Sequence, residues 1–145
     1  MSSQKVDKED NKIQEGRECI LVYGFGAKDY SKLRNYCMMM GIRDLIQVEK
    51  DMLNEKVRNI LGNEIETSQC KEAPGDRAII INAFSGQKLH TFLGNFKRTG
   101  LQRPLIATVT PTSLNWTILE LISELQKERE AIAKNNQMLH EKNER

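Results

Sequence analysis

Residues 77–100 read RAIIINAFSGQKLHTFLGNFKRTG, and this stretch combines the strongest strand pattern of the chain with a helical pattern. The apolar run at residues 78–81 predicts a buried β-strand. Ser85 is placed to cap a helix that Gly100 ends. Within that helix, apolar residues recur at helical spacing, at Leu89, Phe92, Leu93 and Phe96. The stretch therefore predicts one strand followed by one helix.

The same pattern continues outward in both directions. The other predicted strands are residues 19–23, 44–50 and 105–109. The other predicted helices are residues 27–40, 51–61 and 117 onward. Asp51 is the predicted N-cap of the second of these helices, and Thr117 with Glu120 forms a capping box for the last.

Strands that alternate with helices predict an α/β fold with a four-stranded, mostly parallel sheet. A single constant shift along the sequence aligns the two halves without a gap, so that Leu21 falls on Ile80 and Gly41 on Gly100. Two βαβα repeats with their first strands central give the strand order 2-1-3-4, followed by a long C-terminal helix. The match between the halves does not require an internal repeat, because any two βαβ units share such a pattern. For the fold as a whole, a ferredoxin-like α+β sheet is the alternative. That alternative needs the second strand to lead directly into the third.

The length and charge limit the class of protein. The chain has 145 residues, 39% of them hydrophobic, which suits one domain with a real core. We expect a disordered tail at residues 1–16, an α/β domain at 17–126 and a projecting or fraying helix at 127–145. A net charge of +2 argues against a nucleic-acid partner, and no apolar run suits a membrane span or a secretory signal.

No motif indicates catalysis, a metal or a cofactor. The only histidines, His90 and His140, are far apart in the sequence, and P-loop, zinc and nucleophile-elbow patterns are missing. Three cysteines without a C-x-x-C motif predict a reducing, cytoplasmic setting, with Cys37 on the apolar stripe of its helix. Whether the chain is an enzyme stays open, and a non-enzymatic binding or regulatory domain is the first hypothesis.

A ligand site is predicted where the strand order reverses, between the first and third strands. There, three loops at residues 24–28, 83–87 and 110–117 are expected to converge. The candidate ligand or partner residues are Gly26, Lys28, Asn82, Ser85, Thr110, Thr112, Asn115 and Trp116. The two glycine-containing loops fit binding of a small anionic ligand, such as a phosphorylated molecule or a nucleotide. Ordinary strand-to-helix turns with a Ser or Asp near the cap are the alternative that the pattern favours. Trp116 fits either a partner contact or a plug at the end of the sheet.

The last helix leaves a third hypothesis open, a homodimer with a second copy. Apolar residues recur at seven-residue intervals, at Ile118, Leu125, Ile132 and Leu139. The companion positions Glu128, Asn135 and Lys142 are polar, so a strict coiled-coil seam is lost after Leu125. We expect the first half of this helix to pack on the sheet.

Residues 104–121, PLIATVTPTSLNWTILEL, carry a resemblance to a known family. With the Val-Tyr-Gly-Phe run at residues 22–25, they resemble an uncharacterised bacterial family, a domain of unknown function, over about residues 18–130. The Thr-Pro-Thr-x-x-Asn-Trp-Thr string at residues 110–117 is the most specific part. The resemblance implies a bacterial cytoplasmic protein and no particular activity or partner.

Overall fold

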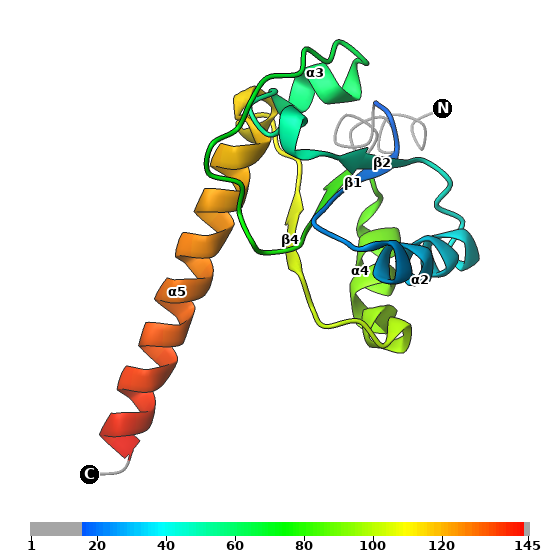
Figure 1. Cartoon of the computed structure of the whole chain (residues 1–145). Helices are drawn as coiled ribbons and strands as arrows, with labels where there is room; N and C mark the ends of the chain where they lie inside the picture. Colours follow the sequence, from blue (N-terminus) through cyan, green and yellow to red (C-terminus); the bar gives the residue numbers. More distant parts are fainter. Residues whose placement is uncertain (1–15, 144–145) are drawn as a thin grey trace, which may run out of the picture.

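Four strands form one sheet in the computed structural model, which describes residues 16–143 (Figure 1). They are β1 (Cys19–Tyr23), β2 (Leu45–Val48), β3 (Ala78–Asn82) and β4 (Leu105–Thr108). Their order is β2-β1-β3-β4, as predicted, and both outer pairings, β1 with β2 and β3 with β4, are parallel. The prediction of a mostly parallel α/β sheet is confirmed. The ferredoxin-like alternative is wrong, because the edge strands of such a sheet would run antiparallel to their neighbours.

The central pairing differs from the prediction. β1 and β3 are antiparallel, with Cys19 opposite Asn82, Tyr23 opposite Ala78 and Leu21 opposite Ile80 at the centre. An apolar run carries no information on strand direction, and the segment from residue 49 to 77 is long enough to reach either end of β3. The carboxyl ends of β1 and β3 therefore lie at opposite rims of the sheet. The predicted crevice between these two strands is wrong.

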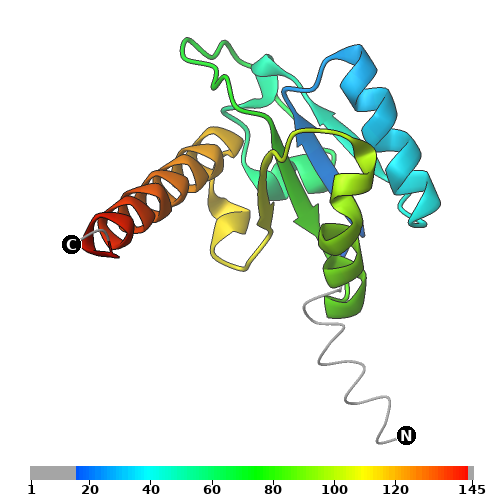
Figure 2. The ribbon, with the colours of Figure 1, turned by 90° about the horizontal axis from the view of Figure 1, so that it is seen from below.

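Helices cover both faces of the sheet (Figure 2). One face carries α2 (Ala27–Met39), α4 (Gly86–Asn95) and the short 3₁₀-helix η2 (Phe96–Thr99). The other carries α3 (Val57–Leu61) and the start of α5 (Ile118–Asn143). Alternate strand residues serve the two cores, since Ile20 and Ile79 pack under α2 and α4 while Leu21 and Ile80 pack under α3 and α5.

Most predicted helix ends are confirmed in atomic detail. The Ser85 hydroxyl accepts the Lys88 N–H at 3.1 Å, and Thr117 and Glu120 exchange two capping-box hydrogen bonds of 3.1 Å. After α2, Gly41 takes a φ of 78°, and the Ile42 N–H donates to the Cys37 carbonyl at 2.8 Å. This is the Schellman arrangement, in which an apolar residue follows the left-handed one.

The helix predicted for residues 51–61 begins later than expected, and Asp51 is not its cap. A 3₁₀-helix, η1 (Lys50–Met52), comes first, and α3 begins only after Lys56. The carbonyls of Leu53 and Glu55 instead accept the N–H groups of Leu119 and Ile118, at 3.0 and 3.1 Å. Tertiary hydrogen bonds to the start of α5 thus replace the local helical ones.

α5 packs on the sheet through its first turns and then leaves it (Figure 1). Ile118, Leu121 and Ile122 are buried, as expected for the first half, and every residue from 127 to 137 is exposed. Among the described residues, no helix has the length and apolar character needed to cross a membrane. The tail predicted for residues 1–16 lies, up to residue 15, outside the described part.

Candidate functional site

The antiparallel central pair divides the predicted site between two rims of the sheet. Gly26 and Lys28 follow β1 and lie at one rim, whereas Ser85 and Thr110 follow β3 and β4 and lie at the other. The structure therefore brings together two of the three predicted loops. Each rim has its own cavity, and the two cavities differ in size and chemistry.

The larger cavity, which we call the β3–β4 groove, has a volume of about 750 Å³. It lies where β3 and β4 end and α4 begins. Its lining residues are Ile81, Ala83, Phe84, Ser85, Gly86, Gln87, Leu89, Thr108, Val109, Thr110 and Pro111. None of these side chains is charged, so the groove offers apolar surface with a few neutral hydrogen-bonding groups.

The predicted residues in this groove also have local structural roles. Ser85 caps α4, and Thr110 and Ser113 hold the turn after β4 through mutual hydrogen bonds, with Thr110 N to Ser113 Oγ at 2.9 Å. Phe84 is buried and meets Phe92 edge-on, with ring centroids 6.1 Å apart, so its ring packs in the core under α2 and α4. The groove is thus held in shape by groups that already have partners.

The lysine beside the Phe84 ring is already engaged. Lys88 Nζ lies 5.3 Å from the Phe84 ring centroid and forms an ion pair with Glu18. A phosphate in the β3–β4 groove would therefore meet backbone amides at the start of α4 but no free lysine or arginine among the lining residues. This chemistry suits an uncharged ligand better than an anionic one.

The other predicted residues lie outside this groove. Asn82 donates from its side chain to the Arg17 carbonyl at 2.8 Å, and Gly26 and Lys28 are exposed at the opposite rim. Thr112 and Asn115 are exposed around the short 3₁₀-helix η3 (Ser113–Asn115).

Trp116 is half-buried against the core under α3 and α5. Its carbonyl accepts the N–H of Val57 at 2.9 Å, which ties the start of α5 to α3. Trp116 does not line the β3–β4 groove, so it and the groove are separate features of the chain.

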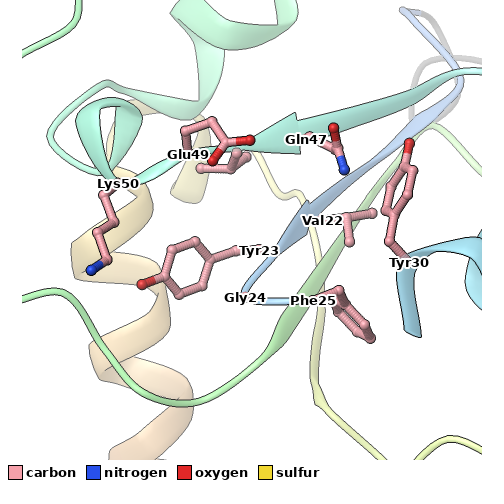
Figure 3. A pocket seen from close by; sticks show the side chains of 9 residues that line it. Val22, Tyr23, Gly24, Phe25, Tyr30, Gln47, Glu49 and Lys50 are labelled. Atoms are coloured by element: carbon pink, nitrogen blue, oxygen red, sulfur yellow. The ribbon is translucent and has the colours of Figure 1, made fainter. Parts of the chain in front are cut away.

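The smaller cavity, the β1–β2 pocket, has a volume of about 180 Å³ and lies at the carboxyl ends of β1 and β2 (Figure 3). Sequence reasoning missed the polar residues that it takes from β2 and the turn after it, Gln47, Glu49 and Lys50. In Figure 3 Tyr23 and Phe25 point to different sides of Gly24, so their rings do not form one binding wall.

The two cavities occupy corresponding places in the two βαβ units. The shift that aligns the two halves of the sequence places Val22, Gly24, Phe25 and Tyr30 of the pocket on Ile81, Ala83, Phe84 and Leu89 of the groove. The same shift places Glu49 and Lys50 of the pocket on Thr108 and Val109 of the groove. This correspondence was the signal that could have identified Glu49 and Lys50, whereas Gln47 falls on Ile106, which does not line the groove.

The cysteines add no reactive group to either rim. Burial raises the pKa of the Cys19 and Cys37 thiols to about 12, so both are protonated at neutral pH. Cys70 is partly buried and packs against the core under α3 and α5. Within the described part of the chain, no three His, Cys, Asp or Glu side chains lie close enough to hold a metal ion.

Comparison with known proteins supports part of the predicted resemblance. Residues 77–132 match the family model of a domain of unknown function, DUF3783. The match runs from the start of β3 to the middle of α5 and includes all residues of the β3–β4 groove, whereas residues 18–76 lie outside it. No curated protein and no solved structure matches the chain.

Proposed function

We propose that this protein is a non-enzymatic binding or regulatory domain that holds a small uncharged ligand in the β3–β4 groove. The observation that carries the proposal is the lining, which joins apolar residues such as Leu89 and Val109 to neutral polar ones such as Gln87 and Thr110. A few polar groups on an apolar cavity wall are typical of small-molecule sites. The predicted phosphorylated ligand would find no cation in the lining.

Two glycines of α4 allow a matched test of this proposal. Gly86 lines the groove and Gly94 does not, and a Cβ added at either position would meet nothing within 4 Å. Gly86→Leu fills the groove, while Gly94→Leu changes an exposed position of the same helix. Both variants should fold, because neither glycine takes a positive φ and an added Cβ has open space at both positions.

The measurement is a thermal-shift screen of neutral and anionic compounds, nucleotides and sugar phosphates included. A ligand at about 100 times its Kd adds about 2.7 kcal/mol to the free energy of unfolding. We expect neutral compounds to stabilise the wild type and the Gly94→Leu variant but not the Gly86→Leu variant. Stabilisation by anions alone, or equal stabilisation of both variants, would contradict the proposal.

The three cysteines, all free, support the cytoplasmic setting that forms part of this proposal.

A homodimer through α5 is a second candidate. Ile132 is 60% exposed beside a groove of about 390 Å³ that also takes Leu125 from α5 and Ile106 from the edge strand β4. Light scattering on the full chain and on the Ile132→Glu variant tests it. A dimeric mass for the wild type and a monomeric mass for the variant would support the dimer, and two monomeric masses would end the idea.

We also propose that the two βαβ units are an internal repeat. The central strand pairing supports it, because Leu21 and Ile80, which the sequence shift aligns, face each other at the centre of the sheet. The same shift joins residues that share a positive φ, Gly24 (84°) with Ala83 (63°) and Gly41 (78°) with Gly100 (74°). An experimental structure in which residues 19–48 fail to superpose on 78–107 would contradict the repeat.

A further inference from the structure

The charge of the chain is distributed unevenly, although its net charge is small. The helical layer of α2, α4 and η2 is basic, whereas the rest of the chain is acidic overall. α2, α4 and η2 together carry six basic residues and one acidic residue, a net charge of +5. The chain as a whole carries +2, so all its other residues together carry −3. The single acidic residue, Asp29, is already paired with Arg77 at 2.9 Å.

Five of these six cations are exposed, and we call them the basic face: Lys28, Lys32, Arg34, Lys97 and Arg98. Within residues 16–143, none of the five takes part in an ion pair. Unpaired like charges on one surface repel one another and raise the local potential, which favours an anionic partner.

An apolar groove lies within the basic face, where α2 and η2 end side by side. This α2–η2 groove has a volume of about 340 Å³, with Tyr36, Met39 and Met40 among its apolar lining and Lys32 and Arg98 as its cations. Met39 is 86% exposed, and the neighbouring Met38 is exposed as well. Methionine side chains adapt their shape to a partner and are common at surfaces that bind helices.

We propose that the α2–η2 groove and the basic face bind an acidic amphipathic helix of a partner protein. The apolar side of such a helix would cover Met39 and the groove, and its carboxylates would meet Lys32 and Arg98 at the rim. The charge of the face is complementary to acidic side chains and its apolar floor is complementary to the opposite side of the same helix.

A nucleic acid fits this surface less well. A phosphate backbone offers no apolar group for Met39, and no exposed aromatic side chain is present in the groove for base stacking. The β3–β4 groove is a different surface, so this proposal does not depend on the proposed function.

The test uses the full chain and defined probes in fluorescence anisotropy. The main probe is a labelled helical peptide with leucines on one side and glutamates on the other. Its controls are a Glu-to-Gln version, a scrambled version without the apolar stripe, and a labelled DNA duplex. We expect the acidic amphipathic peptide to bind about tenfold or more tightly than all three controls.

Variants identify the surface. Lys32→Glu with Arg98→Glu, and separately Met39→Glu, should each weaken binding about tenfold or more. The matched control, Lys71→Glu with Lys134→Glu, makes the same change in net charge at exposed positions outside α2, α4 and η2 and should leave binding unchanged.

Three results would overturn the proposal: no binding of the acidic peptide, equal loss in the control variant, or a duplex that binds as tightly as the peptide. Circular dichroism melting of each variant separates loss of binding from loss of fold. The Gly86→Leu variant should bind the peptide normally, so failure of the β3–β4 groove proposal and failure of this one remain distinguishable.

Discussion

Gly24 and Ala83 each follow a central strand and take left-handed backbone conformations, with φ of 84° and 63°. Such a φ costs an L-residue roughly 1–2 kcal/mol, whereas glycine adopts it freely. A Cβ at Gly24 would also approach the Cα of Arg77 to 3.3 Å, which is a tight contact. The chain thus tolerates strain at Ala83, beside the β3–β4 groove, and avoids it at Gly24.

Exchanging the two residue types should therefore have opposite effects. Gly24→Ala should lower the free energy of unfolding by about 1–2 kcal/mol, because it adds both strain and a close contact. Ala83→Gly should raise it by up to about 1 kcal/mol, since the strain relieved exceeds the entropic cost of glycine. Urea denaturation measures both changes, and a destabilised Ala83→Gly variant would show that the alanine methyl group packs favourably.

Glu55 is a buried carboxylate whose hydrogen bonds hold the segment after α3 to the domain. Its oxygens accept from Asn59 Nδ2 at 2.7 Å, from the N–H of Glu66 at 2.7 Å and from the N–H of Lys56 at 3.1 Å. These bonds, that from Asn59 foremost, lower the pKa of Glu55 below its ordinary value. A lowered pKa in the folded state means that the carboxylate stabilises the fold at neutral pH.

The Glu55→Gln variant should lose about 1–3 kcal/mol of the free energy of unfolding at pH 7, because the amide group cannot serve both backbone donors. The contribution of Glu55 is complete above the ordinary glutamate pKa and is lost as the pH falls through the lower, folded-state pKa. Denaturation curves of wild type and variant should therefore converge in acid. If the difference in unfolding free energy between wild type and variant stays constant with pH, the loss comes from packing and not from the charge of Glu55.

At the scale of elements, two ion pairs connect the first βαβ unit with the second. The first unit and the residue before it supply both acidic partners, and the second unit and the residue before it supply both basic partners. Arg77, before β3, pairs with Asp29 of α2, and Glu18, before β1, pairs with Lys88 of α4. The shift that aligns the two halves places Glu18 on Arg77 and Asp29 on Lys88. Each cation also lies 5.3 Å from a phenylalanine ring centroid, Arg77 at Phe25 and Lys88 at Phe84.

The acidic residues of the first half therefore complement the basic residues of the second half. Two copies of the same half would instead bring like charges together at both positions. Asp29→Lys alone should lower the free energy of unfolding, and adding Arg77→Glu should restore part of the loss. Because both groups are partly exposed, the coupling energy should be about 0.2–1 kcal/mol and should shrink in salt. A double-mutant cycle by urea denaturation measures it, and an additive cycle would contradict the coupling.

At the scale of the whole molecule, one sheet separates two apolar cores. Cys37 lies in the core under α2 and α4, and Cys19 lies in β1 and faces the core under α3 and α5. β1 contributes alternate residues to both, Ile20 to one and Leu21 to the other. Loss of either core therefore exposes one side of the central strands, which links the stability of the two layers.

Thiol labelling tests this link, because both thiols are buried and protonated in the folded state. We expect Cys19 and Cys37 to become reactive with the same opening free energy, equal to that of global unfolding. Cys70 should react faster, as it is only partly buried. Mass spectrometry of pulse-labelled protein reports each site, and a much lower opening energy for one buried thiol would show independent layers.

The sequence determined the elements of this protein, their order in the sheet and most of their ends. Ser85, Gly41, Gly100 and the Thr117–Glu120 pair act within a few residues of their own positions, so their effects can be predicted from local patterns. Short connections inside each βαβ unit predicted that β1 lies beside β2 and β3 beside β4, and the order 2-1-3-4 followed from placing the first strand of each unit at the centre. Among the candidate site residues, Ser85 and Thr110 do line one groove, because they follow neighbouring parallel strands of the same βαβ unit.

Only the tertiary structure decided the direction of β3 relative to β1, the late start of α3 and therefore the positions of the rims. Buried strands such as 19–23 and 78–82 have the same apolar pattern in either direction, and backbone hydrogen bonds form in both parallel and antiparallel pairs. The direction depends on the long connection from residue 49 to 77 and on its contacts with α5, such as Glu55 with Ile118. Those contacts join segments that lie far apart in the sequence, which no local pattern encodes.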